Sequence, residues 1–142
     1  MKIKATMLLI MIVMMNSIFA QTSNVKVFIS FSMPENLIEQ MAHESARLHV
    51  PLIVNGLHNS SMRETLAKIF DIAQREKNVS IQIDPVSFNK YGINRVPSVV
   101  VDNNENFDVI AGNIKIANAL KIISDEGTTG FSYSKFVGDH NA

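Results

Sequence analysis

Apolar and polar positions alternate along most of the chain with one of two periods, that of a strand or that of a helix. Residues 25–30 alternate with a period of two and are rich in β-branched side chains, which predicts a strand. Residues 51–54 form a second predicted strand, and the continuous apolar run 96–101 is typical of a central strand. Shorter strands are predicted at 81–83 and at 107–111, the latter as a hairpin partner after the turn-forming residues 102–106.

Three segments carry apolar side chains at helical spacing and are predicted to be helices with one buried stripe each. The stripe of the first helix comprises Leu37, Ile38, Met41, Ser45 and Leu48. That of the second comprises Met62, Leu66, Ile69, Phe70 and Ala73. The third helix spans 114–124, buries Ile116, Leu120 and Ile123, and ends at Gly127. Phe88 and Tyr91 indicate a brief additional helical turn.

Two serines are predicted to begin helices. Ser32 and Glu35 in one case, and Ser61 and Glu64 in the other, have the spacing of a capping box. In that motif the hydroxyl accepts a hydrogen bond from a backbone N–H of the first turn, and the carboxylate reaches back. The resulting order is strand, helix, strand, helix, strand, short helix, strand, strand, helix, which predicts one α/β domain with a mixed sheet and flanking helices.

The first twenty residues have the pattern of a secretory signal peptide. Lys2 and Lys4 precede the apolar run 5–15, and Ala20 supplies a small residue before the expected cleavage site. An uncleaved membrane anchor is the alternative, but the apolar run is shorter than the roughly 20 residues that span a bilayer. We therefore expect a signal peptide at 1–20, cleaved after Ala20, a folded domain at 21–127 and a C-terminal tail at 128–142.

Composition excludes several classes of function. The 142 residues include no cysteine, so a disulfide, a thiol nucleophile, an iron–sulfur cluster and a cysteine-bearing zinc site are all excluded. The 13 basic and 13 acidic side chains balance, which argues against a protein that binds nucleic acid. The four histidines lack metal-binding spacing, and no motif links any of them to Ser32 as a catalytic base. We expect no enzyme activity, no cofactor, no metal and no small-molecule substrate.

The element order resembles the thioredoxin fold. Residues 91–100, with Pro97 at the start of a central strand, look like the stretch that leads into the cis-proline of that fold, and the resemblance predicts a cis Val96–Pro97 bond. Ser32 and Glu35 stand where the two reactive cysteines of thioredoxins would be. Because disulfide exchange needs a thiolate, the resemblance covers the fold and not its redox chemistry.

A narrower resemblance covers most of the expected domain. The chain resembles the TrbC family of F-type conjugative transfer systems in four stretches: 27–34, 50–57, 82–85 followed by Phe88, and 92–102. Asn55 departs from the family, whose members often have a basic residue there, so no role of charge is expected at this position. The resemblance implies a periplasmic protein that acts in pilus assembly of a type IV secretion system, beside a TraW-type partner and other secretion components. It brings no catalytic residues.

Two partner-binding surfaces are expected. One consists of Phe31, Ser32, Met33 and Pro34 close to Val96 and Pro97, because thioredoxin-like proteins bind extended chains there. The other is the tail, which holds three of the ten aromatic residues of the chain, Phe131, Tyr133 and Phe136. Two interpretations of the tail stay open: it packs on its own domain, or it is an arm that adds to the edge of a partner's sheet.

The function expected is therefore assembly of a conjugative pilus by protein binding without redox activity. The alternative is a thiol-free periplasmic chaperone, or an accessory of a disulfide-exchange pathway, that binds many unfolded clients weakly. A hydrolase based on Ser32 is disfavoured, since a capping role already accounts for this serine.

Overall fold

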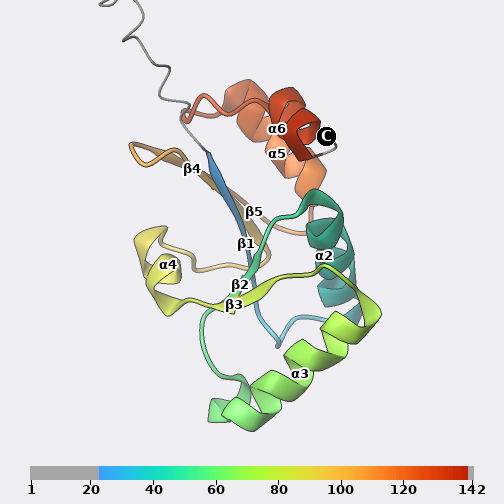
Figure 1. Ribbon diagram of the computed structural model, residues 1–142. Coiled ribbons are helices and arrows are strands. Elements are labelled where there is room, and N and C mark those ends of the chain that lie inside the picture. The colour runs from blue at the N-terminus through green and yellow to red at the C-terminus, as the bar shows by residue number, and fades with distance from the viewer. Residues whose placement is uncertain (1–22, 141–142) are drawn as a thin grey trace, which may run out of the picture.

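Five strands form one mixed sheet with the order β3-β2-β1-β4-β5 (Figure 1). The structure, a computed structural model, describes residues 23–140, so the expected signal peptide and its cleavage site lie outside the described residues. The strands are β1 (Asn24–Ile29), β2 (Leu52–Val54), β3 (Ile81–Ile83), β4 (Ser98–Asp102) and β5 (Phe107–Ala111). The helices are α2 (Glu35–Leu48), η1 (His58–Ser60), α3 (Met62–Arg75), α4 (Pro85–Lys90), α5 (Ile116–Glu126) and α6 (Tyr133–His140).

The strand pairing confirms the mixed sheet that the sequence predicts. β1 lies in the centre, parallel to β2, with Phe28 opposite Ile53, and antiparallel to β4. β2 and β3 are also parallel, as expected for strands joined through helices, whereas β4 and β5 form the predicted hairpin. The carboxyl ends of β1 and β2 therefore meet at the same edge of the sheet.

Each central strand contributes side chains to two hydrophobic clusters, one on each face of the sheet, because successive side chains point to opposite sides. The larger cluster lies under α2 and α5, where Val27, Leu52 and Val99 meet Ile38, Met41 and Leu120. The smaller lies under α4 and comprises Phe28, Ile53, Phe88, Tyr91 and Val100. α4 lies over this cluster, on the side of the sheet opposite α2 (Figure 1). No helix within residues 23–140 is long and apolar enough to cross a membrane.

The first helix begins differently from the prediction. The position before α2 is occupied by Pro34, whose carbonyl oxygen accepts from the backbone N–H of Leu37 at 3.0 Å and of Ile38 at 3.1 Å. No side chain caps this end, so the predicted capping box of Ser32 and Glu35 is wrong. Ser32 lies too far upstream, and Glu35 binds the Arg75 guanidinium at 2.8 Å instead. The second capping serine is confirmed: Ser61 Oγ accepts from the backbone N–H of Glu64 at 3.2 Å.

The predicted buried stripe of α3 is wrong at four of its five positions. Met62 is 52% exposed, Leu66 54% and Phe70 64%, and Ala73 is exposed, whereas Ile69 is half-buried against the larger cluster. The buried residues of this helix are Thr65 and Ile72. The helix is thus rotated about its axis relative to the prediction, with most of its apolar stripe in contact with solvent. In α2, by contrast, the predicted stripe is confirmed by the burial of Ile38, Met41 and Ser45.

Residues 128–140 pack against their own domain. Phe131 is buried in the larger cluster, and Tyr133 and Phe136 of α6 pack against that cluster from outside. The segment leading into α6 is fastened by Asp108, whose carboxylate accepts hydrogen bonds from the backbone and hydroxyl groups of Thr128 and Thr129. The tail is therefore a helix on the surface of this domain rather than an extended strand.

Candidate partner-binding site

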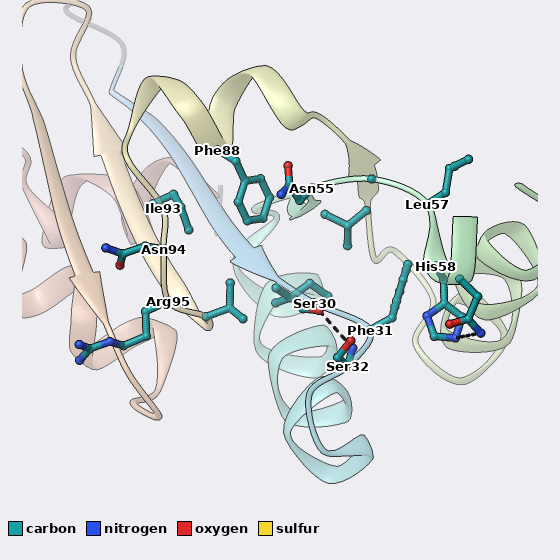
Figure 2. A pocket seen from close by; sticks show the side chains of 15 residues that line it. Ser30, Phe31, Ser32, Asn55, Leu57, His58, Phe88, Ile93, Asn94 and Arg95 are labelled. Atoms are coloured by element: carbon teal, nitrogen blue, oxygen red, sulfur yellow. Dashed lines mark hydrogen bonds between the residues drawn. The ribbon is translucent and has the colours of Figure 1, made fainter. Parts of the chain in front are cut away.

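A cavity of about 520 Å³ opens at the carboxyl ends of β1 and β2 (Figure 2). Three segments far apart in the sequence line it: 29–32, 54–59, and Phe88 with 93–96. Crevices at the carboxyl ends of parallel strands are common ligand sites in α/β proteins, because loops from neighbouring strands converge there. The topology of this chain therefore creates the cavity by placing the end of β1 between β2 and β4.

The first wall is the turn between β1 and α2. Ser30 Oγ accepts from the backbone N–H of Ser32 at 3.1 Å, and the sulfur of Met33 accepts from the N–H of Ser30 at 3.4 Å. A backbone hydrogen bond of 3.1 Å from Met33 to Ser30 closes the turn. These contacts give the segment a fixed shape without any side-chain cap on α2.

The second wall is the segment that connects β2 to α3. The backbone N–H of His58 donates to Thr65 Oγ1 at 2.8 Å, and the ring of Phe31 meets the ring of His58 edge-on at 5.9 Å. Asn59 and Ser60 adopt positive φ angles of 50° and 57°, a conformation that asparagine tolerates better than most residues. This tight turn carries the chain from the rim of the cavity into α3.

The third wall precedes β4. The Val96–Pro97 bond is cis, as predicted. Pro97 is buried and its carbonyl oxygen accepts from Gly112 at 2.9 Å, while Val96 is half-buried at the cavity. Ser98 Oγ donates to the carbonyl of Arg95 at 2.6 Å, and Ile93 N–H donates to the carbonyl of Phe88 at 2.9 Å. The segment that leads into the strand is thereby tied to both α4 and β4.

Asp102 fastens α4 to the sheet, and with it the Phe88 side of the cavity. Its carboxylate accepts from Lys90 Nζ and from the Tyr91 hydroxyl, each at 2.6 Å. Burial raises the pKa of Asp102, but these hydrogen bonds, with a further one from the backbone N–H of Asn104, outweigh burial and lower the pKa to about 2. Asp102 is therefore ionised at any pH well above 2.

The lining is apolar and neutral polar in character. Among residues 23–140, Arg95 is the one lining residue with a permanent charge, and no carboxylate lines the cavity. The guanidinium of Arg95 points away from the middle of the cavity (Figure 2). Phe88 points into the cavity from α4, facing Asn55 (Figure 2). Residues 23–140 contain no group of three or more histidine, aspartate or glutamate side chains that would suit a metal ion.

The structure brings together only part of the expected partner-binding surface. Phe31, Ser32 and Val96 line the cavity, although Phe31 is largely buried. Met33 is half-buried beside the turn, Pro34 is exposed outside the cavity, and Pro97 is buried beneath it. The tail residues Phe131, Tyr133 and Phe136 pack on the larger cluster and are not among the residues that line this cavity.

Sequence reasoning missed the residues of the second wall, and Phe88 and residues 93–95 near the third wall. The missed lining includes Asn55, Leu57, His58, Asn59, Phe88, Ile93, Asn94 and Arg95. The sequence did contain a signal for the second wall. The segments that follow two neighbouring parallel strands are expected to lie at the same edge of the sheet. Applying that rule to β1 and β2 would have paired Asn55 with Ser30.

Ser32 and His58 line the same cavity, yet their geometry does not form a nucleophile and base. Among the hydrogen bonds of residues 23–140, none joins these two side chains; the imidazole of His58 contacts the amide of Asn59 at 3.4 Å. A serine nucleophile needs a base within hydrogen-bond reach and a third group that orients the base. With no carboxylate in the lining, the third group is also missing.

The fold and the cis-proline define a thioredoxin-like protein, and two solved structures support this class. DsbF from MTB, in its mixed oxidized and reduced forms, matches with a TM-score of 0.52 and 14% identity, over 74% of this chain and 81% of DsbF. The pneumococcal exposed lipoprotein thioredoxin Etrx1 from Streptococcus pneumoniae strain TIGR4 matches with a TM-score of 0.54 and 14% identity, over 75% of this chain and 87% of Etrx1. At this identity the likeness concerns the fold alone.

Within this class the sequence identifies the family. Residues 27–130 match the model of the type-F conjugative transfer system pilin assembly proteins, and the chain belongs to this TrbC family. It is 31% identical over 100 residues to the periplasmic protein TrbC of Escherichia coli K12, across 70% of this chain and 47% of that protein. The chain thus spans about half the length of this curated relative. The description of this family is pilin assembly in conjugative transfer, which agrees with the family that the sequence resembles.

Proposed function

We propose that this chain is a periplasmic assembly factor of a conjugative type IV secretion system that acts by binding a protein segment, without redox activity. The observation that carries the proposal is the cavity at the carboxyl ends of β1 and β2. There a thioredoxin-like fold offers a lining of apolar and polar side chains, with no carboxylate and no thiol among residues 23–140. Disulfide exchange requires a thiolate. What such a frame retains without thiols is the ability to hold an extended chain.

The contacts that the lining offers suit an extended peptide. Phe88, Ile93 and Val96 supply an apolar surface for one side chain, and Asn55 and Asn94 supply amide groups able to donate to and accept from a peptide backbone. In this proposal Phe31, Ser32 and Val96 contact the bound segment directly. Met33, Pro34 and Pro97 shape the surface around it.

The partner is proposed from the family rather than from the geometry. A TraW-type periplasmic pilus-assembly protein is the first candidate, with other components of the secretion system beyond it. The periplasmic location of the E. coli relative supports export of this chain, with a signal peptide at 1–20 cleaved after Ala20.

We include in this proposal a binding role of the tail at 128–142, limited to the side chains that the tail leaves accessible. Because Phe131 is buried, a partner of the tail would meet the half-buried Tyr133 and Phe136 on α6, or would have to displace the helix. Truncation before Thr128 tests this role, provided that the remaining domain stays folded by circular dichroism. Unchanged partner affinity in a folded truncated protein would contradict it.

The test of the cavity is recovery of partners by tagged protein from the periplasm of cells that carry the transfer system. Val96→Glu places a charge beside Phe88 and Ile93 and is expected to abolish recovery of a transfer-system partner. Met33→Glu is expected to weaken that recovery. Val86→Glu is the matched control, because Val86 is 74% exposed on α4 and lies outside the cavity lining. Equal recovery by Val96→Glu and Val86→Glu would contradict binding at this site.

The same experiment separates this function from the alternative, a thiol-free chaperone or accessory of disulfide exchange. An assembly factor is expected to recover one dominant component of the transfer system. A broad set of unfolded envelope proteins, with no transfer component among them, would favour the chaperone.

A further inference from the structure

α3 exposes an apolar face that the sequence pattern assigned to the core. Met62, Leu66 and Phe70 follow one another at intervals of four residues, so their side chains form one ridge, and Ala73 is exposed beside it. The ridge lies away from the cavity, since none of its residues is in the cavity lining. Contiguous exposed apolar side chains of this kind are typical of interaction surfaces.

Polar contacts at both ends hold α3 in this rotation. At the N-terminal end, Thr65 Oγ1 donates to the carbonyl of Ser61 at 2.7 Å and accepts from His58 at 2.8 Å. At the other end, Arg75 forms ion pairs with both Glu35 and Glu39 of α2. Turning the ridge toward the core would break the contacts of Thr65 with His58 and of Arg75 with Glu35 and Glu39, so the exposure of the ridge is built into the domain.

The charges around the ridge are asymmetric. Arg63 lies three residues before Leu66 and seven before Phe70, so it borders the ridge, and within the described residues it has no ion pair. Asp71 pairs with Arg75 at 2.5 Å, and Glu64, which accepts from the neutral Asn59 amide at 2.8 Å, keeps its charge. Both carboxylates lie one or two residues from a ridge residue, a spacing at which side chains do not face one another on a helix. The ridge is therefore bordered by a cation that has no ion pair among residues 23–140.

We infer that the ridge of α3 is a docking site for an amphipathic helix of another protein whose apolar face is bordered by acidic side chains. A ridge with a four-residue interval packs into the groove of a second helix, which is why the occupant is a helix rather than a strand. Arg63 then faces an acidic border. A second copy of this chain is the less suitable occupant, because it would present the same basic border.

The experiment uses two synthetic helical peptides of about 18 residues, each with a leucine face, one bordered by glutamate and the other by lysine. Each labelled peptide is titrated with the full-length chain, and binding is followed by fluorescence anisotropy. The glutamate-bordered peptide is expected to bind at least about tenfold more tightly. The double variant Leu66→Gln, Phe70→Gln is expected to weaken that binding at least about tenfold, since exposed anchors of an interface dominate its affinity.

Two controls keep the inference falsifiable. Val86→Gln, an exposed valine on α4, is expected to leave binding unchanged, and circular dichroism is expected to show the double variant folded, because the substituted side chains are exposed. Arg63→Glu is expected to remove the preference for the glutamate-bordered peptide. Equal binding of both peptides, or binding that survives the double variant, would overturn the inference. Self-association that the double variant abolishes, with neither peptide bound, would assign the ridge to a second copy instead.

Discussion

α2 and α3 have the same length, and both have an apolar stripe on one side, yet they use these stripes in opposite ways. α2 buries Ile38, Met41 and Ala42 completely or nearly so against the sheet. α3 exposes most of its stripe and contacts the domain through Thr65, Ile69 and Ile72 and through its ion pairs with α2. An amphipathic pattern therefore indicates that a helix has a face to cover, but it does not indicate which surface covers it.

The physical difference lies in what each helix packs against. α2 follows the central strand β1 directly and lies over Val27, Leu52 and Val99 of three neighbouring strands. α3 follows a tight turn and leads to β3, a three-residue strand at the edge of the sheet. A strand at the edge with only three residues offers too little apolar surface to cover a helix of this length.

The largest expected difference between the two helices is in their tolerance of truncation to alanine. Met41→Ala is expected to lower the free energy of unfolding by about 3 kcal/mol, because it opens a cavity in a closely packed core. Leu66→Ala is expected to change it by no more than about 0.5 kcal/mol. Urea denaturation followed by circular dichroism measures both. A comparable loss in the two variants would contradict the exposure of α3.

The next largest expected effect on stability comes from the hydrogen bond between the backbone of His58 and the side chain of Thr65. Thr65→Val preserves the shape of the side chain but leaves the backbone N–H of His58 without its partner, and we expect a loss of about 1–2 kcal/mol. Thr65→Ser, which keeps the hydroxyl, serves as the control. If the valine variant were as stable as the wild type, polar contacts would not be what fixes the rotation of α3.

The two serines of the predicted capping boxes give a smaller and cleaner contrast. Ser61→Ala is expected to cost about 1 kcal/mol, because Ser61 Oγ caps α3. Ser32→Ala is expected to fall within about 0.5 kcal/mol of the wild type, since Ser32 caps no helix. Both are measured by urea denaturation. A loss in Ser32→Ala equal to that of Ser61→Ala would restore the capping box that the structure contradicts.

The smallest effect concerns pH. The hydrogen bond from Arg75 holds the pKa of Glu35 below its ordinary value of 4.5. Because the pKa in the folded state is the lower one, the ion pair stabilises the contact between α2 and α3 above pH 4.5, and this contribution is lost as the pH falls through the folded value. Amide exchange in α3 is expected to lose its protection more steeply below pH 4.5 in the wild type than in Glu35→Gln. Identical profiles would contradict this role of Glu35.

The fold was largely predictable from local patterns. The two-residue period of the β1 segment, the continuous apolar run of β4 and the position of Pro97 each specify a local structure that the sheet then requires. The start of α2 was not predictable in this way, because Ser32 and Pro34 both suit a helix N-terminus and only their distance from the first turn decides between them. The rotation of α3 depends on Arg75 meeting Glu35 and Glu39, which lie far away in the sequence.

The cavity was predictable only in part for the same reason. Phe31, Ser32 and Val96 belong to stretches that carry the family resemblance, and they do line it. Phe88 and Asn55 enter the lining through the pairing of β1 with β2 and the packing of α4 on the sheet, which no local pattern encodes. The motifs thus located residues of the first and third walls, and the topology supplied the second wall and Phe88.

The central claim is that this chain acts in pilus assembly through its cavity, by binding. The most direct test is complementation: cells whose transfer system lacks this chain receive the wild type, Val96→Glu or Val86→Glu, and pilus number and the frequency of DNA transfer are measured. Both variants make the same change to a valine, one in the cavity and one exposed on α4. The account predicts that Val96→Glu, folded and at normal abundance, fails to restore transfer while Val86→Glu restores it. Full transfer with a folded Val96→Glu variant would contradict the account.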